Sequence, residues 1–517
     1  MAKVKFLIFL PLFFVFSVNS VWAQPVNING LDMTYIEENG KKLYRINQAS
    51  FEQQGTNITC NRADYDKLDN VVYCYENVVV TEASGTRVTG NYLKYDADNK
   101  VAQMDGGVVL TDKDLTLTTP SIQYNTAAKT GLYTSGGRIV DGENTLTSRV
   151  GIYNSNSKML FFRHNVVLIN PQYSMKGDTL QYNTTSRTAF FYGPTIIKSE
   201  DNTIYCNYGW YNTRSGKSQF SKHAVIISKE NTISADSMLY NRNDATGAAF
   251  GDIVLEDSIQ KVNIFGQKGT YNRNSKNTMI TGKPVARQWT DNDTLMLKAD
   301  TFLYIQDTLG KRHLSAYKNA GIFKPDLSAV ADSLVYLVED SMFRLFYDPV
   351  LWNDNNQVSA DTIQIFIKNS KVNLLKMKNK SMIIQEESPG RYNQISGVNM
   401  DNYFDQNKLK SVNVLGNGIS IYYLKENDSL YTGVNYINCE NMKVELDSSR
   451  IKNIRFYNQP KGTLFPLNEL PADKKQIPGF VWRAERKPTI EQFAITLKQK
   501  EKQTKASIKK QAPKQKK

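Results

Sequence analysis

An aromatic residue recurs along the chain at a nearly constant interval, and this repetition limits the possible folds more than any other feature of the sequence. We call this residue the anchor of each repeat. The anchors are Tyr65, Tyr95, Tyr124, Tyr153, Tyr182, Tyr211, Tyr240, Tyr271, Tyr304 and Tyr336, with Ile365 in the eleventh place. Neighbouring anchors are 29 to 33 residues apart. A fixed period of this length predicts a repeat protein in which each unit packs on its neighbours.

Each repeat has the sequence pattern of two β-strands and two turns. Leu180 and Tyr182 alternate with Thr179 and Gln181, and a period of two is that of a strand with one buried face. After a polar turn, a second strand ends in an aliphatic triplet. These triplets lie at 78–80, 108–110, 166–168, 195–197 and 253–255. We therefore predict an all-β fold, a repetitive antiparallel β-jellyroll built from about ten units.

Two smaller patterns refine this prediction. A residue that disrupts strands stands twelve positions after many anchors, which indicates a bend or a bulge in the second strand. These residues are Asn77, Gly107, Gly136, Asn165, Pro194 and Asp252. Two positions before the anchor, large side chains alternate with glycine, as in Ile122, Gly151, Leu180 and Gly209. This alternation lets side chains of neighbouring strands interdigitate.

The N-terminus has the pattern of a secretory signal peptide. Residues 1–23 contain Lys3 and Lys5, then an apolar stretch, and then a small-x-small cleavage site that ends at Ala23. The apolar stretch is shorter than the roughly 20 residues that a membrane span needs. We expect an exported, periplasmic protein with no transmembrane segment after cleavage, associated with the inner or the outer membrane. An uncleaved membrane anchor is the alternative.

The rest of the chain divides into three predicted segments. Residues 24–370 hold the repeats, residues 371–490 form a further β-rich module, and residues 491–517 are a lysine-rich flexible tail. The formal net charge is +14, but the last twenty residues alone contain nine Lys and one Glu. Because the excess charge belongs to this tail, it does not indicate a nucleic-acid partner for the folded part.

The sequence does not predict an enzyme, a metal site or a cofactor. His164, His223 and His313 are far apart in the chain, and no catalytic signature stands near them. An Asp four residues before many anchors recurs too often to be a catalytic pair, so we expect it to bond backbone N–H groups where a turn enters a strand. Cys60 and Cys74 flank a turn and are a possible disulfide; two half-buried thiols are the alternative.

Three repeats carry a resemblance to a known family. The segments "GDTLQYN…AFFYGPTII", "ADSMLYN…AFGDIVL" and "ADSLVYL…LFYDPVLW" resemble the OstA-like and LptA-like lipopolysaccharide-transport proteins. The resemblance covers residues 30–370, and residues 396–465 look like the extra module of long OstA-like proteins from Bacteroidetes-type bacteria. It implies a β-jellyroll that shields the acyl chains of lipid A, and partners of the same fold that pair with its open edge strands.

This resemblance leads to a specific hypothesis for the binding site. If the interior is a lipid groove, its lining is the anchors together with the apolar residues two positions before them. The candidate residues are Leu93, Tyr95, Ile122, Tyr124, Leu180, Tyr182, Met238, Tyr240, Phe302 and Tyr304. A closed, dry core made of the same side chains is one alternative. Two others concern the whole protein: a secreted β-helix that acts as an adhesin or a polysaccharide-binding protein or lyase, and an LptC-like protein that keeps its N-terminal anchor.

Overall fold

The structure is a computed structural model that describes residues 27–493, except 54, 230, 290–293, 370, 427–429 and 448–449. It separates into two compact units, one ending at Asn165 and one beginning at Val166. The predicted signal peptide and the predicted tail from residue 494 onward lie outside the described residues. The boundary between the units falls inside the predicted repeat region, and the predicted boundaries at 370 and 490 stay predictions.

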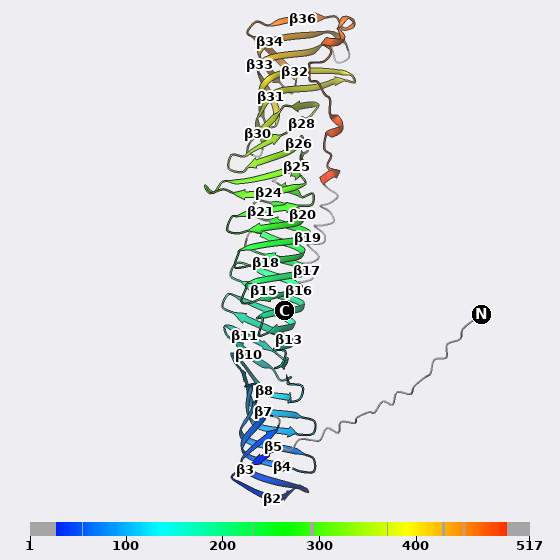
Figure 1. Ribbon diagram of the computed structural model, residues 1–517. Coiled ribbons are helices and arrows are strands. Elements are labelled where there is room, and N and C mark those ends of the chain that lie inside the picture. Colours follow the sequence, from blue (N-terminus) through cyan, green and yellow to red (C-terminus); the bar gives the residue numbers. More distant parts are fainter. Residues whose placement is uncertain are drawn as a thin grey trace, which may run out of the picture. The chain divides into compact units, whose positions relative to one another are not determined.

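The first unit consists of antiparallel strands joined by short turns (Figure 1). Its strands are β1 (Asn27–Asn29), β2 (Asp32–Glu38), β3 (Lys41–Gln53), β4 (Thr56–Asp66), β5 (Val71–Glu82), β6 (Arg87–Asp96), β7 (Val101–Asp112), β8 (Leu115–Asn125), β9 (Thr130–Tyr133), β10 (Gly137–Asp141), β11 (Asn144–Ser148), β12 (Val150–Asn154) and the beginning of β13 (Met159–Asn170). Each long strand pairs with the strand before it and the strand after it.

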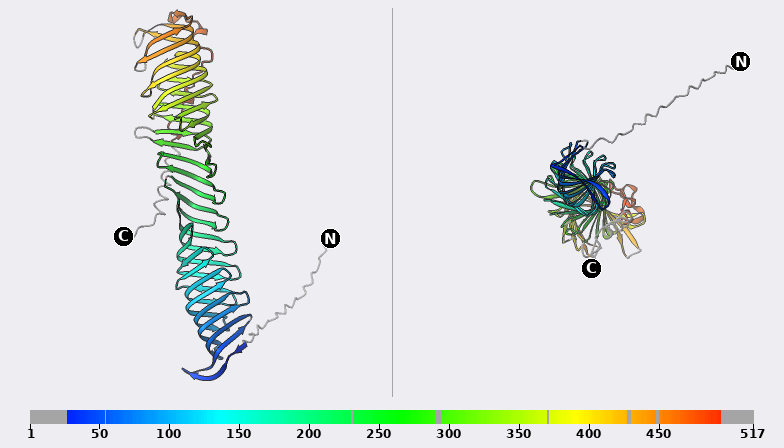
Figure 2. Two further views of the ribbon diagram at one scale, coloured as in Figure 1. Left: turned by 90° about the vertical axis from the view of Figure 1, so that its left-hand side faces the viewer. Right: turned by 90° about the horizontal axis from the view of Figure 1, so that it is seen from below.

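The second unit continues with the same pattern (Figure 2). Its strands are β14 (Tyr173–Asn183), β15 (Thr188–Ser199), β16 (Thr203–Asn212), β17 (Lys217–Ile227), β18 (Asn231–Asn241), β19 (Thr246–Asp257), β20 (Val262–Asn272), β21 (Asn277–Thr281), β22 (Val285–Trp289), β23 (Thr294–Lys298), β24 (Thr301–Gln306), β25 (Arg312–Lys324), β26 (Leu327–Leu337), β27 (Met342–Phe346), β28 (Val350–Asn353), β29 (Asn356–Ser359), β30 (Thr362–Lys368), β31 (Lys371–Ser388), β32 (Arg391–Asp405), β33 (Lys408–Lys425), β34 (Tyr431–Asp447), β35 (Arg450–Tyr457) and β36 (Lys461–Phe465).

These pairings confirm the predicted antiparallel, jellyroll-like all-β fold. They also exclude the β-helix alternative for the described residues, because the strands of a β-helix run parallel. The described helices are short: η1 (Leu467–Glu469), η2 (Ala472–Lys474) and η3 (Ala484–Arg486) follow the last strand. None of the helices in the described residues is long and apolar enough to cross a membrane.

A column of bulges crosses the long strands, and it confirms the predicted bends. In β5, Glu76 and Asn77 both adopt left-handed backbone angles, with φ of 61° and 48°. The register with β6 shifts at the same place, between Tyr75 and Val78. Such bulges turn a strand and leave two residues outside the ladder. Left-handed residues also occur at the predicted positions Gly107, Gly136, Asn165 and Asp252, and at Gly193, just before Pro194.

In both compact units, the bulges divide the long strands into two halves, and we call the two resulting parts of the sheet arms. The anchor arm contains the anchors, and the triplet arm contains the aliphatic triplets: in β5, residues 71–75 lie in the anchor arm and residues 78–82 in the triplet arm. Burial alternates along each arm, because every second side chain points inward. In β14, Leu180 and Tyr182 are buried, whereas Gln181 between them is half-exposed. The core therefore lies between the two arms.

Glycines opposite large side chains explain the predicted alternation in size. Gly151 in β12 pairs with Tyr133 in β9, and a Cβ atom at Gly151 would come within 2.3 Å of the Tyr133 ring. Gly209 in β16 pairs with Phe191 in β15 in the same way, and its Cβ would lie 2.6 Å from the Phe191 ring. The missing side chain thus makes space for the aromatic ring of the neighbouring strand.

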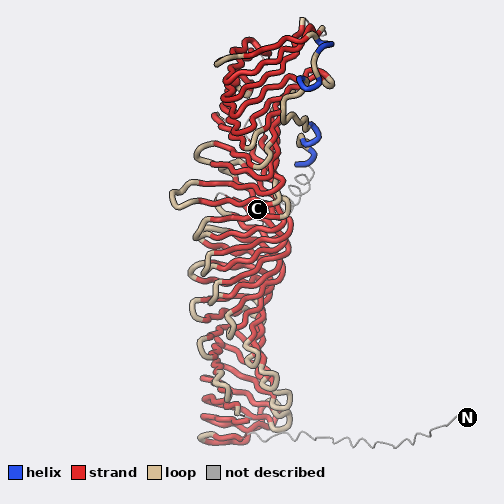
Figure 3. Tube along the Cα trace, turned by 45° about the horizontal axis from the view of Figure 1, so that its top comes forward, coloured by secondary structure: helices blue, strands red, loops and turns tan. Residues whose placement is uncertain are grey.

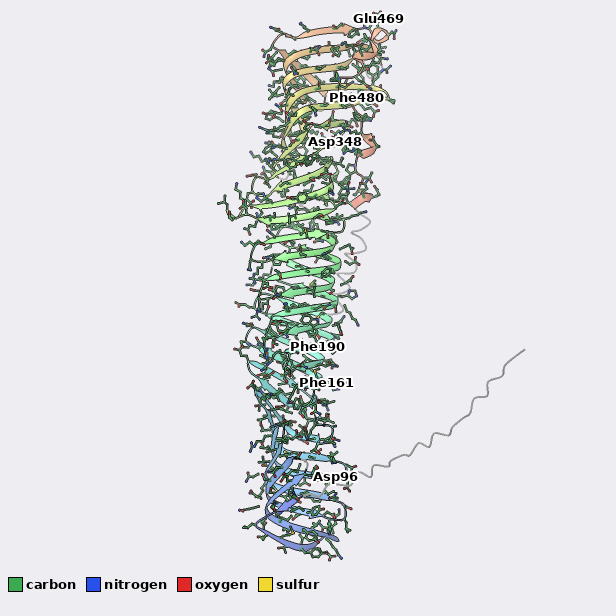
Figure 4. The ribbon with its side chains drawn as sticks, viewed as in Figure 1. Asp96, Phe161, Phe190, Asp348, Glu469 and Phe480 are labelled. Carbon is green, nitrogen blue, oxygen red and sulfur yellow. The ribbon has the colours of Figure 1, made fainter. Side chains whose placement is uncertain are left out.

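After β36, residues 466–493 return along the outer face of the triplet arm in the second unit (Figure 3). We call this segment the C-terminal strap. The Gln357 side chain donates to the Val481 carbonyl and accepts from the Arg483 N–H, both at 2.7 Å. Asp348, which is labelled in Figure 4, forms ion pairs with Arg483 at 2.7 Å and with Arg486 at 2.6 Å.

Apolar side chains also hold the strap in place. Ile477 is 2% exposed and packs with Met382, Ile384 and Ile421. Phe493 is fully buried in a cluster that includes Phe265, and it lies near the ring of Phe323, with centroids 5.8 Å apart. The strap therefore covers an apolar stripe on the outside of the triplet arm.

Candidate lipid-binding interior

The inner face of the anchor arm carries rows of apolar side chains that cross successive strands. In the first unit, one row consists of Ala63, Cys74, Leu93, Met104 and Ile122, which follow from the cross-strand pairs of β4 to β8. None of the five is more than 2% exposed. An extended apolar surface of this kind is complementary to a hydrocarbon chain, which has no polar group to satisfy.

The structure places most of the predicted groove residues in this interior. Tyr240 and Tyr304 are half-buried. The other eight are each at most 5% exposed: Leu93, Tyr95, Ile122, Tyr124, Leu180, Tyr182, Met238 and Phe302. The prediction that these side chains bind lipid stays a prediction, since such burial also fits the dry core that the sequence left open.

Buried polar groups close the mouth between the two arms of the first unit, at the edges away from the bulges. The Tyr124 hydroxyl of the anchor arm donates to Glu82 Oε1 of the triplet arm at 2.7 Å. Lys129 Nζ reaches the same oxygen at 2.9 Å. The Glu82 side chain is only 2% exposed. We call this three-residue contact a clasp, because it joins the free ends of the two arms.

The clasp recurs one repeat later. Asp112 accepts hydrogen bonds from the Tyr153 hydroxyl and from Lys158 Nζ. Burial would raise the pKa of Asp112, but the bonds from Lys158 and Tyr153 outweigh it, and the net shift lowers the pKa. One repeat earlier, the Tyr95 hydroxyl donates to Gln53 at 2.9 Å. The clasps therefore follow the period of the repeat.

Sequence reasoning missed the clasp carboxylates, although a signal for them exists. Glu82 and Asp112 each stand two residues after a triplet, and Lys129 and Lys158 each stand five residues after an anchor. An Asp or Glu after a strand and a Lys after a turn are common on protein surfaces. Only the contact between the arms reveals that these groups are buried together.

The Asp that recurs four residues before many anchors lies at the column of bulges. The expectation that it lies where a turn enters a strand was therefore wrong. β14 runs from Tyr173 to Asn183 with Asp178 in its middle, next to the register shift. Asn319, in the bulge of the neighbouring strand, donates to Asp300 at 2.8 Å. Polar side chains at this bend bond to the groups that the bulge leaves outside the ladder. In the described residues, no group of three or more His, Cys, Asp or Glu could hold a metal ion.

Cys60 and Cys74 lie close together, but the structure holds both as free thiols. Their side chains form a hydrogen bond with each other, and Cys60 Sγ also donates to the Arg62 carbonyl at 3.2 Å. Cys74 faces Ala63 across the ladder, beyond the register shift that separates it from Cys60. The sequence thus placed the two thiols near each other, but the structure does not form the predicted bond.

A cleft opens between the arms near the end of the second unit. Its volume is about 580 Å³, and its lining comes mainly from β31 to β35. We call it the C-terminal cleft. Apolar and polar side chains both line it, unlike the row of purely apolar side chains in the first unit.

Comparison with known proteins finds a family model that matches the N-terminal part of the chain. Residues 26–178 match the OstA-like proteins, whereas no curated protein matches the chain. A crystal structure similar to this chain is that of LptH, the LptA-homologous periplasmic component of the lipopolysaccharide transport device from Pseudomonas aeruginosa. The similarity covers 20% of this chain and 74% of that chain, with 17% sequence identity and a TM-score of 0.18. Over residues 26–178, this chain is therefore similar to the OstA-like proteins.

Proposed function

We propose that this protein is a periplasmic lipid-binding bridge that shields the acyl chains of lipopolysaccharide on the way to the outer membrane. The observation that carries the proposal is the inward row of apolar side chains that crosses β4 to β8 without a polar interruption. The match of residues 26–178 to the OstA-like proteins supports the same function. In this function the protein is a carrier and not an enzyme.

The physical requirement for such a protein is the cost of moving hydrocarbon through water. Each CH₂ group that leaves an apolar environment costs about 0.8 kcal/mol. A row of buried side chains that continues from strand to strand offers the chain an apolar neighbour at each step. The interior rows have this property, because the inward apolar side chains of successive strands lie next to each other across the sheet.

Entry of a lipid requires a change in the arms. In the first unit the clasps hold the mouth closed, with Glu82 and Asp112 both buried. Hydrocarbon reaches the interior row there only when a clasp opens or when the chain enters from the end of the jellyroll. The proposal therefore includes the clasps as the groups that set lateral access in this unit.

One end of the jellyroll offers an edge for a partner. β2 pairs with β3, and no other described strand pairs with β2. Leu31 is 72% exposed, and Met33 and Tyr35 on β2 are 52% and 54% exposed. An open edge with exposed apolar side chains fits the addition of a strand from another protein. We propose that the partner is a jellyroll protein of the same transport system.

Photo-crosslinking in cells tests lipid binding in the interior. A photo-reactive amino acid in place of Met238, which is 3% exposed, should give an adduct with lipopolysaccharide. Its neighbour Leu239 is 41% exposed and points to the other face, so the same replacement there is the matched control. The pair of Leu180 and Gln181 provides the same comparison two repeats earlier in the array.

The outcomes separate the two accounts of the interior. Adducts from Met238 and Leu180 but not from their neighbours support a lipid-binding interior. Adducts only from Leu239 and Gln181, or from no position, show that the interior is a dry core. The mass of the N-terminus of the exported protein decides between a cleaved signal and a retained anchor.

A further inference from the structure

The C-terminal cleft has an interior unlike that of the rest of the described jellyroll. Its volume of about 580 Å³ lies in the range of small-molecule binding pockets. It lies between the arms, where the repeats elsewhere pack apolar side chains against each other. Here the two walls differ in chemistry, and this difference indicates what the cleft can hold.

The wall from the anchor arm is apolar. It consists of aliphatic side chains from three consecutive strands, β33, β34 and β35. These residues are Leu409, Val412, Val444, Leu446, Ile451 and Ile454. A surface of six aliphatic side chains without a polar group accommodates a hydrocarbon chain and offers nothing to a sugar or an ion.

The wall from the triplet arm combines isoleucines with polar side chains, although it faces the inside. Gln385 of β31 pairs with Asn393 of β32, and both line the cleft. The Asn393 amide donates to Gln385 at 3.2 Å and to Glu387 at 3.0 Å. Tyr422 of β33 lines the cleft as well. Polar side chains inside a jellyroll are informative, because apolar residues normally fill such positions.

A small polar side chain, Ser420, also lies on this wall. Ser420 is 3% exposed and lines the cleft beside Ile395, its cross-strand neighbour. A serine hydroxyl can both donate and accept a hydrogen bond, so at this position it offers a polar contact to a ligand in the cleft.

The charges around the cleft restrict the head group of the ligand. Three carboxylates line it, from Asp354, Glu387 and Glu426, against the single ammonium group of Lys425. Lys425 is already paired with Glu387. The lining therefore carries two net negative charges, which disfavour a phosphorylated head group and favour a neutral or cationic one.

We propose that the C-terminal cleft binds an amphiphile with a single aliphatic chain and an uncharged or cationic head group. The hydrocarbon chain lies against the anchor-arm wall, and hydroxyl, amide or amine groups of the head reach the polar side chains of the other wall, Ser420 among them. The cleft thus selects against a phosphorylated head. This site is separate from the interior rows of the proposed function. Crosslinking of lipopolysaccharide at Met238 tests the proposed function, and its result does not decide whether the cleft binds a ligand.

Calorimetric titration of the full chain without residues 1–23 tests the proposal. Three probes share a twelve-carbon chain: dodecyl maltoside, dodecylamine and dodecyl phosphate, each below its critical micelle concentration. We expect the maltoside and the amine to bind with 1:1 stoichiometry, at least tenfold more tightly than the phosphate. The discrimination against the phosphate should disappear in the double variant E387Q/E426Q, because the lining then has no net charge, and should not change in the control E445Q, because Glu445 does not line the cleft.

A second pair of variants locates the binding. Ser420→Phe fills the cleft and should weaken the maltoside at least tenfold. Ser411→Phe, on the same strand but outside the lining, should leave binding unchanged. If Ser420→Phe lowers the melting temperature, its binding result is set aside, and the proposal is tested by the probe preference of E387Q/E426Q. Tightest binding of the phosphate to the unmodified chain, no binding of any probe, or equal effects of the two Phe variants would overturn the proposal.

Discussion

Removal of the Glu82 carboxylate should destabilise the first unit by about 2–3 kcal/mol. The Glu82→Ala change deletes the acceptor of the Tyr124 hydroxyl, a buried group at 2.7 Å. A hydrogen bond to a charged group contributes about 1.5–3 kcal/mol. The loss of the ion pair adds little, because the Lys129 side chain is 29% exposed and regains water. The total is therefore smaller than for a fully buried pair, which costs about 3–5 kcal/mol.

A double-mutant cycle separates the bond from other effects of the change. Tyr124→Phe removes only the hydroxyl and should cost about 1–2 kcal/mol, since Glu82 keeps Lys129 as a partner. The double variant should cost less than the sum of the two single ones, by about 1 kcal/mol or more. Glu52→Ala, at an exposed position on strand β3 of the same unit, is the control and should change stability by less than about 0.5 kcal/mol.

Hydrogen exchange followed by mass spectrometry is the suitable assay, because a long array does not unfold as one two-state domain. Exchange of the β5 to β9 amides should accelerate in Glu82→Ala, while the amides of β31 to β34 should keep their rates. Strict additivity of Glu82→Ala and Tyr124→Phe would refute the clasp as a direct bond between the arms. So would an effect of Glu52→Ala as large as that of Glu82→Ala.

Three further predictions follow from contacts in the two units. Gly151→Val places atoms in the space of the Tyr133 ring and should cost about 1–3 kcal/mol, measured as faster exchange in β9 and β12. Because the folded-state pKa of Asp112 lies below its unfolded value of about 3.9, its clasp contributes stability above that pH and loses it as the pH falls through the folded pKa. Asp112→Asn should therefore flatten the acid limb of a stability–pH curve. Phe493→Ala empties a fully buried site and should cost about 3–5 kcal/mol, seen as faster exchange in β20 and β25.

The sequence predicts the fold well because the fold is built from local, repeated signals. The period of the anchors, the alternation around Leu180 and the breaker at Asn77 each report a local property of one strand, and the structure has all three. The clasps were not predictable in this way. Glu82 and Tyr124 are 42 residues apart, and nothing near either residue shows that their arms meet.

The C-terminal features escaped prediction for a related reason. The strap and the C-terminal cleft occur once, so no repetition separates their residues from ordinary polar sequence. Gln357 looks like a surface glutamine, yet it is 1% exposed and bonds two strap residues more than 120 positions away. Ser420 stands in an alternating strand like any other inward position, and only the unfilled space beside it distinguishes it.

The C-terminal strap has a consequence for the order in which the second unit becomes stable. Strand pairing in a repeat array is mostly between neighbours, so it proceeds as the chain emerges and each step is independent of distant residues. The strap breaks this rule, because Phe493 contacts strands completed some 170 residues earlier, around Phe323. Until the strap has been synthesised and has packed onto the sheet, the apolar stripe beneath it is exposed to water and can associate with other chains. The strap therefore joins separate repeats of the second unit into one cooperative block, and a chain that stops before Phe493 leaves part of this stripe uncovered.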